Sequence, residues 1–96
     1  MVQIDWKDID YATFPAPMFR ADIRDWIEHG VAPPGFLQEI IKNDMKRAAL
    51  LADHDHLKLL GAIVKWFYNH APSHCWGSEE NFTRWHHAHM RGIKYK

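Results

Sequence analysis

The sequence HAPSHCWGSEENFTRWHHAHM, residues 70–90, holds the end of one predicted helix and the start of the next. Pro72 ends the first helix because proline fixes φ and has no backbone N–H to donate. Ser78 is a typical N-cap residue, and the two glutamates after it place negative charge at the positive end of the helix dipole. Beyond them, aromatic and apolar residues recur every three or four positions, at Phe82, Trp85, His86, His89 and Met90. The stretch therefore predicts a helix from Ser78 to Arg91 or Gly92.

The residues between these two helices form a short turn, PSHCWGS at 72–78. Cysteine is among the residue types most often buried, so we expect Cys75 to pack into the core. Trp76 precedes the N-cap, where a hydrophobic residue can pack against the first turn of the helix, here against Phe82. Structural roles are therefore predicted for four residues of this region: Cys75, Trp76, Ser78 and Trp85.

Farther toward the N-terminus, apolar residues with a period near 3.6 predict a helix from Pro17 or Met18 to His29. Gly30 follows it and suits the left-handed position after a helix end. VAPPG at 31–35 comes next, and its two successive prolines fix the backbone. We therefore expect a stiff corner that separates this helix from the rest of the chain.

Two further helices are predicted between this corner and Pro72. One runs from Gly35 to Ala52 along an apolar stripe. The other follows an N-cap at Asp53 or Asp55 and continues to His70. Its inward residues are expected to be Leu57, Leu60, Ile63, Val64 and Phe67.

Asp44 lies on or beside the apolar stripe of the predicted helix 35–52. One interpretation is a buried acid that serves a ligand or partner. The other is a carboxylate that caps the backbone of a neighbouring loop, such as the proline corner or the turn at 72–78. Buried acids are normally paired or hydrogen-bonded, so we favour the structural role.

These elements predict an all-α fold, a compact four-helix domain with an extended aromatic N-terminal arm. The arm covers residues 1–17, the single helical domain residues 18–92, and a basic tail residues 93–96. The arm is aromatic and contains proline, without a sustained helical period. It is expected to pack either onto the body or onto a second copy, which would make a homodimer.

Composition limits the class of protein. A chain of 96 residues, 47% of them hydrophobic, forms one domain with one core. The single cysteine excludes an internal disulfide, and the acids near the start replace the apolar run of a secretory signal. The apolar runs fall well short of the ~20 residues that cross a bilayer. We therefore expect a cytoplasmic protein with no membrane partner.

Five of the eight histidines and the cysteine lie in residues 70–96, which raises the question of a zinc site. His70, His74 and Cys75 would form one ligand group, and His86 with His89 the other. Structural zinc sites usually pair their ligands at short spacings and use two or more cysteines. That pattern is missing here, so no metal or other cofactor is predicted.

Two short motifs resemble catalytic ones, but each has a simpler explanation. DHDH at 53–56 resembles the His–Asp pair of the HD phosphohydrolases, but that chemistry needs further ligands on separate helices. Cys75 beside His74 resembles a nucleophile and its base, although a buried core cysteine explains it better. We therefore predict that the protein is not an enzyme.

The motifs HGVAPPGFL at 29–37, ND at 43–44 and YNHAPSHCWGS at 68–78, followed by an acidic pair and Trp85, resemble those of small proteins encoded by bacteriophages and prophages. The histidines at 74, 86, 87 and 89 lie outside that pattern. The resemblance implies a bacterial virus origin, action in the host cytoplasm and a role outside the virion. It implies an accessory protein that binds a host protein or defence complex and inhibits or modulates it.

A protein-binding role is thus the leading hypothesis, and a nucleic-acid-binding regulatory module is the alternative. The alternative uses the basic end, where residues 84–96 carry four cations and no acid. A solvated C-terminus, with cations near a helix end, explains the same residues without a partner. The residues expected to contact a partner are Trp6, Tyr11, Trp66, Arg84, Arg91, Lys94 and Lys96.

Overall fold

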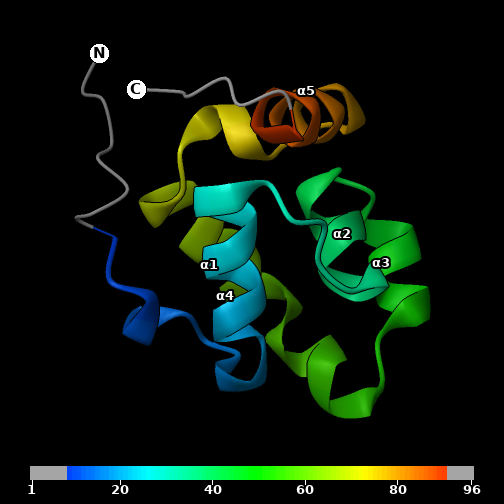
Figure 1. Cartoon of the computed structure of the whole chain (residues 1–96). Helices are drawn as coiled ribbons and strands as arrows, with labels where there is room; N and C mark the ends of the chain where they lie inside the picture. The colour runs from blue at the N-terminus through cyan, green and yellow to red at the C-terminus, as the bar shows by residue number, and fades with distance from the viewer. Residues whose placement is uncertain (1–8, 91–96) are drawn as a thin grey trace.

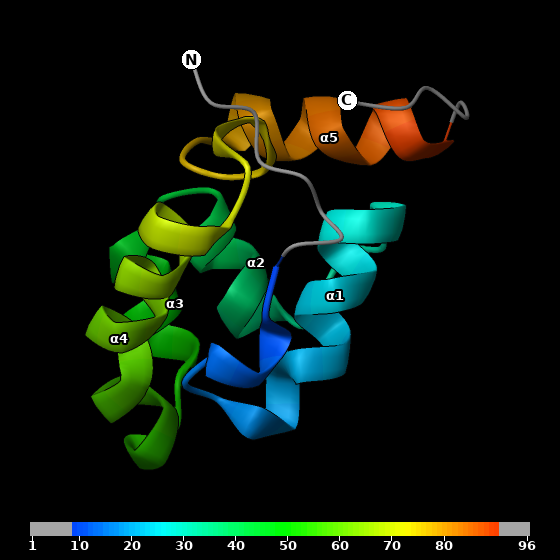
Figure 2. The same cartoon turned by 90° about the vertical axis from the view of Figure 1, so that its left-hand side faces the viewer.

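The structure is a computed structural model that describes residues 9–90, and all regular structure within that range is helical (Figure 1). The chain therefore has an all-α fold, as predicted. Residues 9–90 form five α-helices: α1 (Arg20–His29), α2 (Gly35–Ile41), α3 (Met45–Leu51), α4 (His54–His70) and α5 (Glu79–Met90). The 3₁₀ turns in this range are η2 (Tyr11–Thr13), η3 (Pro17–Phe19) and η4 (Ser73–Cys75). Figure 2 shows α5 lying across one end of α1, α2 and α4.

The corner between α1 and α2 is as predicted. Gly30 adopts a left-handed φ of 68°, and its N–H donates to Trp26 O at 2.9 Å. No side chain fits at this position, because a Cβ on Gly30 would lie 2.8 Å from His89 Cγ of α5. The glycine thus ends α1 and lets α5 pack directly on that end.

The predicted helix 35–52 is two helices, which corrects the expected number of four. Asn43 takes a left-handed φ of 62°, its N–H bonds to Ile40 O, and Asp44 N–H bonds to Glu39 O. This pair of bonds is a Schellman motif, which satisfies the last carbonyls of α2. Asp44 then caps α3 by accepting a hydrogen bond from Arg47 N at 3.1 Å. Asp44 thus caps its own helix α3, and not the proline corner or the turn at 72–78 as the sequence suggested.

α4 begins and ends where the sequence predicted. Asp53 is its N-cap and accepts from His56 N at 2.8 Å, and Ala71 with Pro72 follows its last residue. Ile63 and Phe67 are fully buried, as expected. Leu57 is not, because 46% of its surface is exposed. Its predicted inward position is therefore wrong.

The described part of the N-terminal arm, residues 9–17, is held against the body of its own chain and includes a 3₁₀ turn. Phe14 is buried and packs edge-on against Trp66 with ring centroids 4.9 Å apart. Arg20 donates to Ala12 O, and Trp66 Nε1 donates to Thr13 Oγ1. Of the two expected positions for the arm, this part takes the one on the body, and residues 1–8 lie outside the described residues.

Two buried indoles connect α1, η4 and α5. Trp26 donates to Cys75 O at 3.0 Å, and Trp85 donates to Trp26 O at 2.9 Å. Ser78 caps α5 by accepting from Asn81 N, as predicted. Trp76, expected to pack against Phe82, stacks on Phe67 of α4 with ring centroids 5.4 Å apart, while Phe82 stacks on Trp26 of α1.

Candidate protein-binding surface

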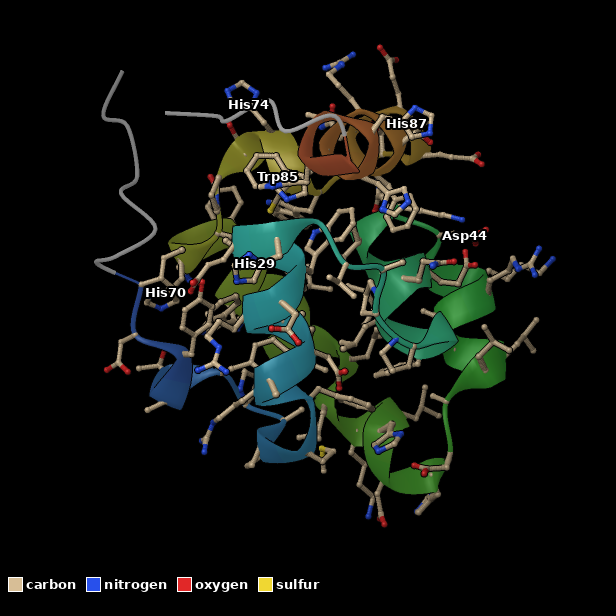
Figure 3. The ribbon with its side chains drawn as sticks, in the orientation of Figure 1. His29, Asp44, His70, His74, Trp85 and His87 are labelled. Carbon is tan, nitrogen blue, oxygen red and sulfur yellow. The ribbon has the colours of Figure 1, made fainter. Side chains whose placement is uncertain are left out.

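The histidines do not converge (Figure 3). His70, His74 and His87 lie on separate parts of the molecule and point outward. Within residues 9–90, no three His, Cys, Asp or Glu side chains are grouped closely enough to hold a metal ion. The zinc hypothesis therefore has no ligand set in the part of the chain that is described.

Cys75 lies in the core, as predicted. Its side chain is fully buried, and burial raises the pKa of the thiol far above its ordinary value. Reactive cysteines need an accessible thiolate. A neutral, covered thiol is suited to packing, which agrees with the structural role expected for this residue.

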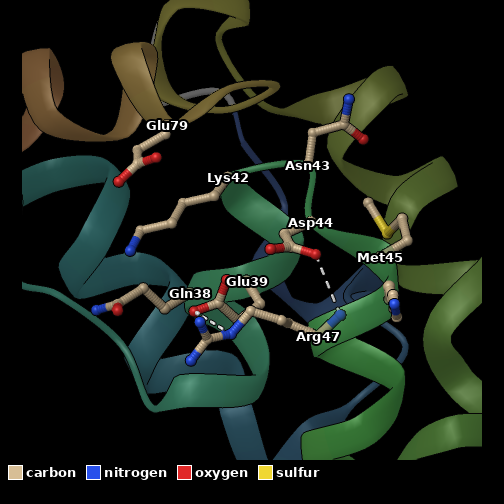
Figure 4. A pocket seen from close by; sticks show the side chains of 9 residues that line it. Gln38, Glu39, Lys42, Asn43, Asp44, Met45, Arg47 and Glu79 are labelled. Carbon is tan, nitrogen blue, oxygen red and sulfur yellow. Dashed lines mark hydrogen bonds and ion pairs between the residues drawn. The ribbon is translucent and has the colours of Figure 1, made fainter.

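An open hollow of about 730 Å³ lies beside the turn between α2 and α3 (Figure 4). Its lining includes three cations and three carboxylates: Lys42, Lys46, Arg47, Glu39, Asp44 and Glu79. Glu39 pairs with Arg47 at 4.0 Å, and Asp44 is occupied as the α3 cap. These charges balance and are partly used within the fold, so the hollow has no excess of either sign to select a charged ligand.

Trp66 and Tyr11, both expected to contact a partner, pack against each other instead. Their ring centroids are 6.3 Å apart, and only 4% of Trp66 is exposed. Tyr11 is half-buried, and burial together with the nearby Glu28 carboxylate raises the pKa of its hydroxyl. The structure therefore places Trp66 in the core, and the exposed aromatic residue of α4 is Tyr68.

The basic end is described only in part. Arg84 is exposed and forms an ion pair with Glu80 one turn earlier on α5. Arg91, Lys94 and Lys96, and likewise Trp6 of the arm, lie outside the described residues. Of the predicted cationic patch, the described residues thus include Arg84 alone, and its charge is paired with Glu80.

A stripe of α4 at the edge of its core-facing side carries a different set of residues, of which Val64 still packs against the core. Leu57, Gly61, Val64 and Tyr68 follow one another at separations of four, three and four residues. At 100° per residue they fall on one stripe of the helix, which we call the outer seam. Tyr68 is 80% exposed and Leu57 46%, whereas Val64 is half-buried at the edge of the core. Figure 2 shows α4 along one side of the molecule.

Two lysines border the outer seam on the same side. Lys58 and Lys65 are seven residues apart, so they lie one above the other along α4. Both are exposed, and neither forms an ion pair with any of residues 9–90. The surface therefore combines an apolar stripe with an uncompensated positive border.

Sequence reasoning did not select this surface because the core-facing stripe of α4 is more apolar, and Leu57 and Val64 were both predicted to belong to it. A signal was nevertheless present. Gly61 interrupts a long helical pattern, and glycine in a helix interior needs a reason in packing or function. The inner stripe gives no such reason, since Gly61 lies outside it.

Comparison with known proteins does not assign the chain to a family. No family model, curated protein or solved structure matches the chain. The resemblance to phage proteins therefore stays a prediction, and the function has to be argued from the surface.

Proposed function

We propose that the protein acts by binding another protein through the outer seam of α4. The observation that carries this proposal is a three-turn stripe of α4 with two exposed large side chains, Leu57 and Tyr68, on either side of Gly61 and the half-buried Val64. Monomeric proteins bury most large apolar groups, and contiguous exposed ones mark binding sites. Tyrosine is enriched at protein interfaces because it adds contact area with few rotatable bonds.

We also propose that the partner is a host protein or defence complex, which the small phage protein inhibits or modulates in the host bacterial cytoplasm. The motifs around the proline corner and the 72–78 turn support this part. Both motifs build the fold: the corner ends at the start of α2, and the turn positions α5. A protein that occupies a surface of its target needs only a stable scaffold, and this chain supplies one.

The alternative, a nucleic-acid-binding module, has less support in the described residues. Its cations at 91, 94 and 96 are not described, and Arg84 is paired with Glu80. Lys58 and Lys65 alone would displace few counterions from a phosphate backbone. The alternative is nevertheless a distinct outcome of the experiment that tests the proposal.

That experiment is affinity purification of the tagged full-length chain from its bacterial host, with and without nuclease, followed by mass spectrometry. A protein should co-purify with the wild type in both conditions. It should be lost with Tyr68→Ala or Leu57→Ser, which change exposed side chains and leave the fold nearly unaffected. His87→Ala, at an exposed site on α5, is the matched control and should retain the partner. Retention by the seam variants, or loss only after nuclease treatment, would contradict the proposal.

A further inference from the structure

The outer seam has a notch at its centre. Gly61 lies in the interior of α4, where glycine destabilises a helix by about 0.5–1 kcal/mol relative to alanine. Nothing in the described structure requires it, because a Cβ at this position would meet no atom within 4 Å. The glycine therefore leaves open space on the surface, one turn from Leu57 and two turns from Tyr68.

The geometry of the notch matches that of a second helix. Separations of four, three and four residues repeat the apolar spacing of a coiled-coil seam, in which side chains of one helix enter holes on the other. The distance along α4 from Leu57 to Tyr68 is about 16 Å at 1.5 Å per residue. Interaxial distance depends on side-chain size at the contact, so Gly61 permits a close crossing between two larger contacts.

The positive charge of the two lysines beside the seam limits which side chains the second helix can carry. If Gly61 and Tyr68 take the position a of a heptad, Lys58 and Lys65 both take position e. Charged residues at this position pair across the interface and set partner choice. Both lysines lack an ion pair within residues 9–90, so an acidic side chain of the second helix could pair with each of them.

A second copy of the chain fits this surface poorly. Position g beside the seam is filled by Leu60 and Phe67, which pack with the core and offer no partner charge. Two copies crossing antiparallel at Gly61 would bring the lysine borders of both chains together. Like charges facing each other destabilise such a pair, and the positive border therefore acts against self-association.

From these observations we infer that the outer seam docks an amphipathic helix of the partner protein, with an apolar stripe that crosses at Gly61 and acidic residues opposite Lys58 and Lys65. This inference rests on the proposed function and names the part of the partner that is bound. It predicts a contact made mainly by three turns of α4.

The test begins with a photo-crosslinking amino acid in place of Tyr68 in the full-length chain, expressed in the bacterial host. Sequencing of the crosslinked product should identify a partner segment that is helical and acidic. A synthetic peptide of that segment is then titrated against the wild type and its variants. Gly61→Leu should weaken peptide binding by about tenfold or more, equal to about 1.4 kcal/mol. The folded variant should be at least as stable as the wild type, so its midpoint of urea unfolding should be the same or higher.

Two further variants separate the effect of the open space at Gly61 from the effect of the lysine charges beside it. Lys58→Glu combined with Lys65→Glu should weaken peptide binding by about tenfold and reverse its salt dependence. Ala62→Leu, next to Gly61 but turned about 100° away from it, is the matched control and should bind within about twofold of the wild type. Equal affinity of Gly61→Leu and the wild type for the peptide would overturn the inference.

The crosslinking result also separates this inference from the function on which it rests. A basic or non-helical partner segment, a second copy of the chain, or nucleic acid at position 68 would each refute the acidic helix. If a protein still co-purified, and if its binding still required Tyr68 and Leu57, the proposed function would stand although the inferred acidic helix would not. If no protein crosslinked or co-purified at all, both would fail.

Discussion

At the scale of single residues, the two glycines Gly30 and Gly61 show how differently the same residue type can act. Gly30 is required by the fold, since its φ is positive and its missing side chain makes room for His89. Gly61 is not required by the described structure and lies in a region where an alanine would fit. Only the first can be explained by the fold, and the second has a functional explanation in the proposed docking of a partner helix.

This contrast predicts opposite effects of one substitution at the two sites. Gly30→Ala should destabilise the protein by about 2–4 kcal/mol, through left-handed strain and overlap with His89. Gly61→Ala should stabilise it by about 0.5–1 kcal/mol, because only helix propensity changes. Urea unfolding followed by circular dichroism measures both. A Gly30→Ala protein as stable as the wild type would show that α5 does not pack on this end of α1.

At the scale of elements, the break between α2 and α3 is decided by Asn43. Apolar residues keep helical spacing on both sides of this position, and periodicity alone therefore predicts one helix from 35 to 52. In the structure, α2 ends at the left-handed residue Asn43, and a new helix, α3, begins after the Asp44 N-cap. Asparagine tolerates that conformation better than most residues do, since its short polar side chain bonds locally.

Substitutions at Asn43 should therefore separate backbone conformation from side-chain contacts. Asn43→Gly should leave stability unchanged or raise it slightly, as glycine adopts positive φ without strain. Asn43→Val should lower stability by about 1–2 kcal/mol, because a β-branched residue is strongly disfavoured there. Thermal unfolding of the two variants beside the wild type measures the difference. Equal stability of both variants would mean that α2 and α3 form one continuous helix in solution.

Elements that are decided by interactions between neighbouring residues were predictable from the sequence, and those decided by contacts between distant parts of the chain were not. The caps at Ser78, Asp53 and Gly30 depend on a few neighbouring residues. Ser78 and Gly30 were predicted correctly, and Asp53 was one of the two residues predicted to cap α4. The exposure of Leu57 depends on which elements pack against α4, which no local pattern contains. The burial of Trp66 has the same origin, because it is covered by Phe14 and Thr13 from the N-terminal segment. The candidate surface was therefore fully defined only once the tertiary packing was known, although Gly61 already marked it in the sequence.

At the scale of the whole molecule, attachment of α5 to the helices beneath it involves titratable groups. His86 Nδ1 lies 2.7 Å from Gly30 O, and His89 packs on Trp85 beside the end of α1. Burial, followed by the proximity of His29 on α1, lowers the pKa of His89. Its neutral form is thus favoured in the folded protein relative to the unfolded chain.

Stability should consequently fall on acidification. Above the unfolded pKa of about 6.5 His89 is neutral in both states, and below it the unfolded chain takes up the proton first. The stabilisation is present above about pH 6.5 and is lost as pH decreases toward the folded pKa. Urea unfolding at pH 7.5 and pH 5.5 (about one unit either side of that value) should show a smaller loss for His89→Gln than for the wild type. His87→Gln, on the exposed side of α5, should lose as much as the wild type, and an identical loss in all three proteins would exclude this origin.

The burial of Cys75 has a practical consequence for all of these experiments. Because the only cysteine of the sequence is covered and its thiol is held neutral, thiol-specific reagents should leave the native chain unmodified. The protein can thus be handled as if it had no cysteine, without replacing a core residue. A fluorophore or spin label introduced at an added cysteine, for example at Ala62, would attach there alone and report on α4 when a partner binds.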